Sequence, residues 1–560
     1  MSPLPADTLD RAQQAIRTRE SWSAFAERPD REPGADEALA TARVTYESTL
    51  GSEFVLDQPT ERMRVGDEMS PYTGRPLGIA YPVCDVDGLF AAARAAREVW
   101  REVPWQRRVQ ICVRIIDALH ERLFEIAHAN MHTTGQSLSM SCVGAGTNAL
   151  DRGLEALGYA AAALERVPTQ AAWRKQFGRT EVHLDKRWRA EPRGIGVVIT
   201  CASFPTWNAY PALLADLATG NPVIVKPHPT SVLTMALAVR TCQEVLAAEG
   251  LPPTVVQLAA DTAGDLVTTQ LVEHPDCAIV DFTGSPAFGA WVESHAHPAI
   301  AFTETAGINA VVLHSVADLP SVASAIATSL CLFTAQMCTS VQNVYLPRDG
   351  VTTPDGLVSA DDVETALVDA VRAVVDHPTR AAALMGAVQS RETPARVRAA
   401  AEQAGAVGRV LLAPSTYLHP EWPDAWTCTP AVVSVDPSAR ALYADECFGP
   451  VAFVVRCTDS DDALDQALAD VAARGTIASH VYSTDDEWLE AGVQRFWRAG
   501  ASVTCNLTGP MPLNFAAAYS DFHVTGLSPA GNACLTDEAY IAGRFRVVQE
   551  RRPARDPGQP

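Results

Sequence analysis

The chain alternates short apolar runs with longer amphipathic stretches through its middle third. "GVVIT" at 196–200, "PVIVKP" at 222–227, "TVVQLAA" at 254–260 and "CAIVDFTGS" at 277–285 are strand-like, and helical patterns ending in glycine or proline separate them. Strands that alternate with helices through short links predict a parallel sheet covered by helices on both faces. Their continuous apolar character fits burial on both faces.

The regions on either side of this alternation have different patterns. Residues 85–164 repeat apolar positions at helical spacing, and "TTGQS" at 133–137 interrupts them. Residues 1–50 predict a helical N-terminal extension. The charged segment 175–193, "KQFGRTEVHLDKRWRAEPR", predicts a polar hairpin at a surface or a subunit contact. The strand–helix alternation resumes after Glu304, and the polar, proline-containing segment 551–560 predicts a disordered tail.

Length and charge narrow the classes of function. At 560 residues the chain exceeds the roughly 250–300 residues that one hydrophobic core supports, so two or three domains are expected. A net charge of −22 argues against nucleic acid and against an anionic membrane surface as partners. No apolar run approaches a membrane span, and the N-terminus has no apolar signal core. The 13 scattered cysteines contain no CxxC pair, which predicts reduced thiols in a cytoplasm and no metal site.

Several turns at strand ends carry candidate chemistry. Ligands of parallel α/β sheets bind beyond the carboxyl ends of the strands, where Lys226 begins "KPHPTS" and Gly284 and Ser285 begin a helix. Glu304 lies in "AFTETAGINAVVL". Each turn alone also fits an ordinary helix cap or a solvated strand end. No GxGxxG is present, so the standard Rossmann fingerprint is missing.

A thiol at a helix-to-turn junction is the remaining candidate. In "FTAQMCTSVQN", residues 333–343, Cys338 follows the apolar helical pattern "SVASAIATSLCLF" and precedes a polar turn. Taken alone, this cysteine also fits an inert core thiol, as do the other 12.

Read in order, these motifs resemble the aldehyde dehydrogenase superfamily over roughly residues 75–548. The segments that carry the resemblance are "TTGQS", "LATGNPVIVKP", "FTGSPAFG", "ETAGINAVVL", "AQMC" and "ECFGPV". The extension with "RESWSAFAE" and the C-terminal "DFHVTGLSPAGNACLTDEAYIAGRFRVVQ" are similar to the PaaN-type branch of ring-opening aldehyde dehydrogenases of phenylacetate degradation, here without room for a fused hydratase domain.

The resemblance implies an α/β fold with a Rossmann-type cofactor domain, an α/β catalytic domain and a small oligomerisation hairpin. The cofactor domain would comprise 51–174 and 194–303, and the catalytic domain 304–534. The bridging elements would be 175–193 and 535–550. Because the hairpin and the late strand pair across subunits in that family, a homodimer or homotetramer is expected.

The resemblance also implies the reaction and the roles of individual residues. Cys338 would attack an aldehyde and form a thiohemiacetal, hydride transfer to NAD(P) would leave a thioester, and Glu304 would activate the hydrolytic water. The expected substrate is an open-chain semialdehyde of an acyl-CoA thioester. Cofactor contacts are expected from Lys226, His228, Gly284, Ser285, Glu446 and Phe448.

The sequence departs from the family pattern at two places. Ser203, in "TCASFPTWN", occupies the position of an oxyanion-binding asparagine, which leaves Ser203, Asn208 or the backbone N–H of Cys338 as donor. Ala335 replaces the usual glycine before Gln336. The alternatives are a cofactor-free thiol hydrolase or acyltransferase, a general aldehyde dehydrogenase and a non-catalytic scaffold. The retained cofactor motifs argue against the first, and the joint retention of Cys338, Glu304 and Glu446 argues against the last.

The loop after Lys226 bears on the choice of cofactor. NAD-preferring relatives commonly place a glutamate three residues after that lysine, and Pro229 stands there in this chain. The next acid downstream is Glu244, deep in the following helix pattern. Without a carboxylate to repel a 2′-phosphate, the loop predicts NADP in preference to NAD.

Overall fold

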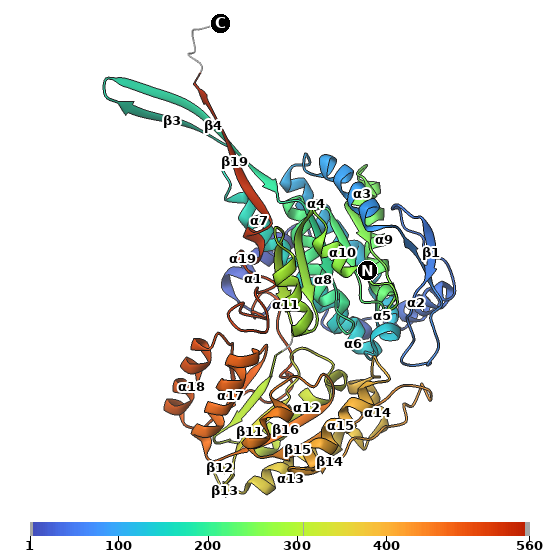
Figure 1. Ribbon diagram of the computed structural model, residues 1–560, viewed down its shortest axis with the longest axis vertical. Helices are drawn as coiled ribbons and strands as arrows, with labels where there is room; N and C mark the ends of the chain where they lie inside the picture. The colour runs from blue at the N-terminus through green and yellow to red at the C-terminus, as the bar shows by residue number, and fades with distance from the viewer. Residues whose placement is uncertain (1–3, 306, 555–560) are drawn as a thin grey trace.

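The computed structural model describes residues 4–305 and 307–554 and contains two α/β units and a projecting sheet (Figure 1). The N-terminal unit is built on a parallel five-stranded sheet in the order β7-β6-β5-β8-β9. Its strands are β5 (Ile195–Ile199), β6 (Val223–Lys226), β7 (Val256–Leu258), β8 (Cys277–Thr283) and β9 (Ile300–Glu304). The predicted apolar runs thus form one sheet, whose carboxyl edge collects the turns after residues 199, 226, 258, 283 and 304.

Helices cover both faces of this sheet, as the amphipathic stretches predict. They are α3 (Val86–Trp100), α4 (Trp105–Glu121), α5 (Leu123–Thr134), α6 (Leu138–Cys142), η2 (Val143–Thr147), α7 (Asn148–Glu165), α8 (Pro205–Thr219), α9 (Val232–Ala248), η3 (Pro253–Val255), α10 (Thr268–Glu273) and α11 (Pro286–His295). Gly135, at φ 85°, ends α5 inside the predicted break "TTGQS". A left-handed residue of this kind ends a helix at little cost only when it is glycine.

The N-terminal extension is helical and is fastened to the body of the unit. It contains α1 (Thr8–Thr18), η1 (Pro29–Arg31) and α2 (Ala35–Thr49), followed by the hairpin β1 (Arg62–Val65) and β2 (Ala80–Val83). Between α1 and η1, the side chain of Ser23 and the backbone N–H of Ala24 donate to the buried carboxylate of Asp151 on α7. Arg19 donates to the hydroxyl of Tyr159 at 2.6 Å. Removing the extension would therefore take hydrogen-bond partners away from buried polar groups of α7.

The C-terminal unit is built on a seven-stranded sheet in the order β14-β15-β16-β11-β10-β17-β18, parallel except for β14. Its strands are β10 (Ala310–Leu313), β11 (Asn343–Pro347), β14 (Arg409–Leu412), β15 (Ala431–Val435), β16 (Val451–Cys457), β17 (Ser479–Tyr482) and β18 (Thr504–Cys505), beside a small hairpin of β12 (Val351–Thr353) and β13 (Gly356–Val358). Its helices are α12 (Leu319–Cys331), η4 (Leu332–Ala335), α13 (Ala360–Val375), α14 (Pro378–Met385), α15 (Thr393–Gly405), η5 (Pro437–Ala439), α16 (Arg440–Tyr443), α17 (Ser460–Arg474) and α18 (Asp486–Arg498).

A three-stranded antiparallel sheet projects from the N-terminal unit (Figure 1). It is formed by β3 (Gln170–Phe177), β4 (Thr180–Pro192) and β19 (Phe545–Pro553), with the short helix α19 (Glu538–Ala542) before the last strand. The hairpin therefore begins at residue 170, ahead of the predicted 175. Residues 551–553, predicted as disordered, pair with β4 in register instead, and residues 555–560 lie outside the described part of the chain.

Buried charge anchors the root of this sheet. Arg544, which is fully buried, pairs with Asp216 of α8 at 2.7 Å and with Asp281 of β8 at 2.6 Å. Removing either partner of such a cluster leaves an uncompensated buried charge, which costs about 3–5 kcal/mol. The start of the last strand is thus fixed to the five-stranded sheet.

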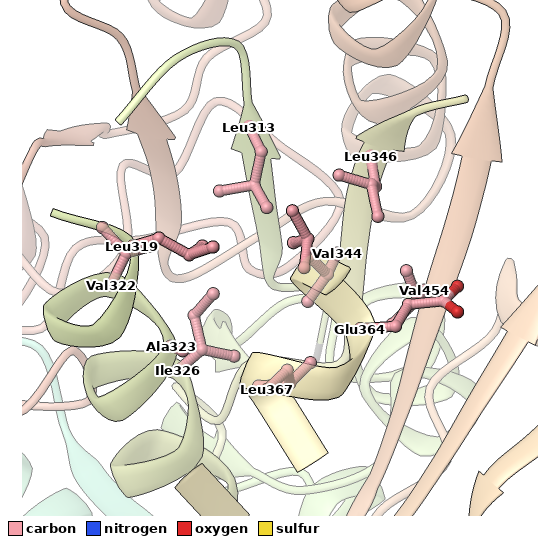
Figure 2. Close-up of a pocket in the computed structure, with 11 residues that line it drawn as sticks. Leu313, Leu319, Val322, Ala323, Ile326, Val344, Leu346, Glu364, Leu367 and Val454 are labelled. Atoms are coloured by element: carbon pink, nitrogen blue, oxygen red, sulfur yellow. The ribbon is translucent and has the colours of Figure 1, made fainter. Parts of the chain in front are cut away.

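An apolar hollow in the C-terminal unit lies between α12, α13 and the seven-stranded sheet (Figure 2). Aliphatic side chains line it, among them Leu313, Ile326 and Leu367. Its one acid, Glu364, is engaged by Ser434 and by Arg456. The hollow presents no unengaged polar group for catalysis and belongs to the core of this unit. Among the described residues, no helix has both the length and the apolar character needed to span a bilayer.

Candidate active site

The candidate nucleophile stands on a strained turn between the two units. After α12 ends at Cys331, Phe333, Thr334 and Ala335 adopt φ values of 50°, 53° and 47°. Each left-handed non-glycine residue costs roughly 1–2 kcal/mol. Ala335, which stands where the resemblance expects glycine, is one of these three residues and therefore adds strain in addition to stiffening the turn.

Hydrogen bonds to the backbone hold this turn in place. Gln336 donates to the carbonyl of Ala387 at 3.1 Å and accepts from the backbone N–H of Gln389 at 2.9 Å. On the other side, Asn309 donates to the carbonyl of Cys338 at 2.7 Å. The Oδ1 of Asn309 accepts backbone N–H groups of Ile477 and Ala478. Asn309 thus connects the nucleophile turn to the strand β17 region, a role that sequence reasoning did not assign.

The side chains of Cys338, Glu304 and His523, from distant parts of the chain, meet in the structure. Glu304, at the end of β9, is completely buried, and its Oε1 lies 3.2 Å from Nε2 of His523. The same Nε2 lies 3.5 Å from Sγ of Cys338. Glu304 is therefore not the solvent-facing strand-edge acid that its sequence context also allowed. Sequence reasoning quoted His523 only as part of a C-terminal resemblance, and a lone histidine in a loop leaves no periodic signal.

Burial and negative charge act together on the Cys338 thiol. Loss of hydration raises its pKa well above the ordinary value, and the nearby Glu304, Cys201 and Glu446 raise it further. The thiol form therefore dominates at neutral pH. Because the thiolate is the nucleophile, attack requires a group that accepts the thiol proton.

The two candidate oxyanion donors are placed differently. Asn208, in the first turn of α8, donates from Nδ2 to Oε1 of Glu304 at 3.0 Å and accepts a hydrogen bond from Sγ of Cys201 at 3.6 Å. Ser203 lies in the turn after β5, where its carbonyl accepts from Gln136 at 2.8 Å. Because the side-chain amide of Asn208 is hydrogen-bonded to Glu304, it orients this carboxylate in the observed structure.

The predicted cofactor residues gather at the carboxyl edge of the five-stranded sheet and on the opposing unit. Ser285 caps α11 by accepting from the backbone N–H of Phe288, and the backbone N–H of Gly284 donates to the carbonyl of Glu304. Across from them, Glu446 and Phe448 line a small hollow with Met337 of the nucleophile turn. Burial raises the pKa of Glu446 to about 7, and Arg396 acts against that rise.

A buried ion pair lies at this edge, where β6 and β7 end. Nζ of Lys226 lies 2.8 Å from Oδ1 of Asp261, which follows β7, and both side chains are buried. His228 is exposed, with Nδ1 2.8 Å from the hydroxyl of Thr230. The sequence-based search for an acid considered only the loop downstream of Lys226, whereas this carboxylate follows the adjacent strand β7.

Unpartnered hydroxyls support the fit of a dinucleotide at this edge. Within the described residues, Oγ1 of Thr200 after β5 and Oγ of Ser231 after β6 are buried and have no hydrogen-bond partner. Buried polar groups are rarely left unsatisfied, and strand ends of open parallel sheets are where such ligands bind. The residues present fit a nicotinamide dinucleotide.

Comparison with known proteins decides the family. The aldehyde dehydrogenase family matches residues 60–511, which is most of the chain. The chain belongs to the aldehyde dehydrogenase family. It is accordingly an NAD(P)-dependent oxidoreductase that acts on aldehydes, with an α/β fold of parallel sheets.

Individual relatives agree with this assignment. An NAD-dependent aldehyde dehydrogenase from Burkholderia multivorans is 43% identical in sequence, with a TM-score of 0.94 over 98% of both chains. A 2-aminomuconic 6-semialdehyde dehydrogenase from Pseudomonas sp is 26% identical over 72% of this chain and 79% of that protein. A benzaldehyde dehydrogenase [NAD(+)] from Pseudomonas putida is 25% identical over 77% and 82% of the two chains.

Proposed function

We propose that this aldehyde dehydrogenase uses NAD to oxidise an open-chain semialdehyde, formed by ring opening in aromatic or phenylacetate catabolism, to a carboxylic acid. The observation that carries the chemistry is the meeting of Cys338, His523 and Glu304 within hydrogen-bonding distance. The PaaN-type resemblance favours a substrate in which the semialdehyde is carried by a CoA thioester. The 2-aminomuconic semialdehyde relative supports the open-chain class. All 13 cysteines are free, which fits a cytoplasmic enzyme.

In this mechanism the chain supplies the nucleophile and the base. The Sγ of Cys338 adds to the aldehyde carbon and gives a thiohemiacetal oxyanion, which the backbone N–H of Cys338 and the Ser203 turn would bind. A nicotinamide held at the carboxyl edge of the five-stranded sheet would supply the hydride acceptor for that carbon, and Cys338 would then carry the acyl group as a thioester on Sγ. Glu304 then takes a proton from a water molecule, hydroxide adds to the thioester carbon, and the acid leaves as sulfur recovers its electron pair.

Cofactor contacts divide between the two units. Glu446 would accept hydrogen bonds from the nicotinamide ribose, and the N-terminus of α11 behind Ser285 would face the phosphates. Lys226 and Asp261 would meet the adenosine ribose. A carboxylate at that position accepts hydrogen bonds from ribose hydroxyls and repels a 2′-phosphate. Because Asp261 also neutralises Lys226, we propose NAD as the preferred cofactor, in place of the NADP preference that Pro229 predicts.

Steady-state kinetics and binding with both cofactors test this choice. Wild-type protein should show a higher kcat/KM with NAD than with NADP. In Asp261→Asn, the ratio of kcat/KM with NAD to kcat/KM with NADP should fall about tenfold, since removing a charge that repels the 2′-phosphate is worth on the order of 1–3 kcal/mol. Quenching of tryptophan fluorescence by each cofactor should show the same shift in relative affinity from NAD toward NADP, in the absence of turnover. Asp265→Asn, which changes an acid paired with Arg64 nearby, is the matched control.

The aldehyde is tested with a substrate panel. Open-chain semialdehydes, free and as CoA thioesters, should exceed benzaldehyde and short aliphatic aldehydes in kcat/KM, with product identified as the acid by mass spectrometry. A preference for benzaldehyde or for short aldehydes would replace the proposed substrate class. A wild-type preference for NADP would overturn the assigned role of Asp261.

A further inference from the structure

His523 occupies a position between the two proposed catalytic groups. It lies in the segment between β18 and α19, which returns from the C-terminal unit to the end of β9. There Thr305 donates its backbone N–H to the carbonyl of Ala530. The imidazole is almost completely buried, with Nε2 3.5 Å from Sγ of Cys338 and 3.2 Å from Oε1 of Glu304. Within the described residues, Nδ1 is buried and has no partner.

The neighbours of the imidazole fix its plane and set its charge environment. Trp207 of α8 packs against it with ring centroids 4.5 Å apart, and the guanidinium of Arg152 on α7 lies 5.2 Å from the centre of the Trp207 ring. From β9 it faces Glu304, and from the nucleophile turn Cys338. Cys201 and Glu446 complete the charged and titratable groups around the sulfur. A cation on His523 would therefore be adjacent to one carboxylate and one developing thiolate.

The two carboxylate oxygens of Glu304 have different surroundings. Its Oε1 accepts from Asn208 and lies 3.2 Å from Nε2 of His523, and its Oε2 has no partner among the described residues. An oxygen that is buried and unpaired in this way is suited to a water molecule. The carboxylate thus has one oxygen held by side chains and one free for hydrolytic water, whereas Sγ of Cys338 has His523 as its hydrogen-bonding side chain.

We propose that His523 is the base that deprotonates Cys338, which leaves Glu304 for activation of water. This inference rests on the proposed function and deepens it. The S–H bond breaks, its electron pair stays on sulfur, and the proton forms an N–H bond at Nε2. The resulting imidazolium lies between thiolate and carboxylate and offsets the repulsion between them. The neutral imidazole must begin with its proton on Nδ1, the nitrogen without a protein partner.

Alkylation of Cys338 tests the proposal without cofactor or aldehyde. Iodoacetamide reacts with the thiolate, so its rate against pH, followed at the Cys338 peptide by mass spectrometry, reports deprotonation. His523→Gln should slow alkylation at pH 7 at least tenfold and move the midpoint upward by about one pH unit or more, since 1.36 kcal/mol corresponds to one pKa unit.

The Glu304→Gln variant separates the two candidate bases. If His523 is the base, Glu304→Gln should alter alkylation at pH 7 much less than His523→Gln does, while abolishing steady-state turnover. The proposal would be overturned if Cys338 were alkylated at the wild-type rate in His523→Gln and slowly in Glu304→Gln. In that case loss of turnover in Cys338→Ser would still support the proposed function, so the two failures are distinguishable.

Two further measurements control for folding and for other thiols. All variants carry Cys201→Ala, because Cys201 is the thiol whose charge acts on Cys338. Thermal unfolding by circular dichroism and quenching of protein fluorescence by NAD establish that each variant is folded. If His523→Gln does not fold, His523→Asn replaces it in the same alkylation measurement. Slow alkylation of Cys338 at pH 7 in that variant would support the proposal, and alkylation at the wild-type rate would overturn it.

Discussion

The amide of Asn208 donates a hydrogen bond to the carboxylate of Glu304 across 3.0 Å, inside a completely buried site. The two residues lie on α8 and at the end of β9, 96 positions apart in the chain. The contact fixes one carboxylate oxygen and leaves the other for water. From this arrangement we expect Glu304 to act in the hydrolytic half of the proposed reaction.

Glu304→Gln should therefore separate the two halves of the reaction. Cofactor reduction in the first turnover should remain rapid, because the thiol and its neighbouring imidazole are intact. Steady-state turnover should fall about 10²–10⁴-fold, the usual contribution of general base catalysis. Stopped-flow absorbance at 340 nm distinguishes burst from steady state, and loss of the burst would instead assign Glu304 to thiol activation.

Cys338→Ser should abolish aldehyde oxidation, since a serine hydroxyl is a much weaker nucleophile than a thiolate in the same site. Binding of NAD, read from fluorescence quenching, should be unchanged. Cys331→Ala, in the buried end of α12, and Cys447→Ala, beside the hollow, are the matched controls and should affect stability or cofactor affinity while retaining turnover. Near-normal activity in Cys338→Ser would contradict covalent catalysis at this residue.

Ser203→Ala tests the oxyanion site. If the hydroxyl of Ser203 donates to the oxyanion, kcat should fall by about 10²–10³ with little change in KM. Because Asn208 binds Glu304 and Ser203 is held through its carbonyl, we expect a loss below tenfold, with the backbone N–H of Cys338 as the main donor. Asn208→Ala is the comparison and should slow deacylation while keeping the burst.

Burial of Glu446 predicts a pH-dependent stability. Its pKa is raised to about 7 in the folded protein, so this residue binds a proton more tightly there than in the unfolded chain. Its contribution to stability is therefore favourable at low pH and decreases as pH rises from about 4.5 to 7. Glu446→Gln should raise the Tm relative to wild type more at pH 8 than at pH 5, while raising the KM for NAD. A Tm difference that is equal at both pH values would contradict this assignment.

The projecting sheet is the part of the chain where we expect contacts between subunits of a homo-oligomer. Phe177, Val547 and Val548 are about half exposed on this sheet, and its outer strands present open edges. Such edges pair readily with another chain. Replacing residues 171–186 by a short Gly-Ser turn should convert a dimer or tetramer to a smaller species in sedimentation equilibrium. Wild-type protein that sediments as a monomer would contradict the expectation from the sequence.

Much of the fold follows from local patterns in the chain. The apolar runs ending at Ile199, Lys226 and Thr283 form parallel strands because a continuous β-branched run is stable only when both faces are covered. The break at Gly135 marks the end of α5 for a local reason, its left-handed φ. The nucleophile turn and the late "ECFGPV" segment were also recognisable, because their residues are contiguous in sequence.

The tertiary structure decided the contacts that complete the site. His523 reaches Cys338 and Glu304 across 185 and 219 positions, and the segment that carries it has neither helical nor strand periodicity. Asp261 meets Lys226 because β7 lies beside β6, and a strand pattern does not specify its neighbour. The sequence by itself therefore determined the main elements and singled out the candidate nucleophile and the candidate acid. Only the packing of distant segments decided which charges surround them, since Coulomb and hydrogen-bond energies depend on distance in space and not on separation along the chain.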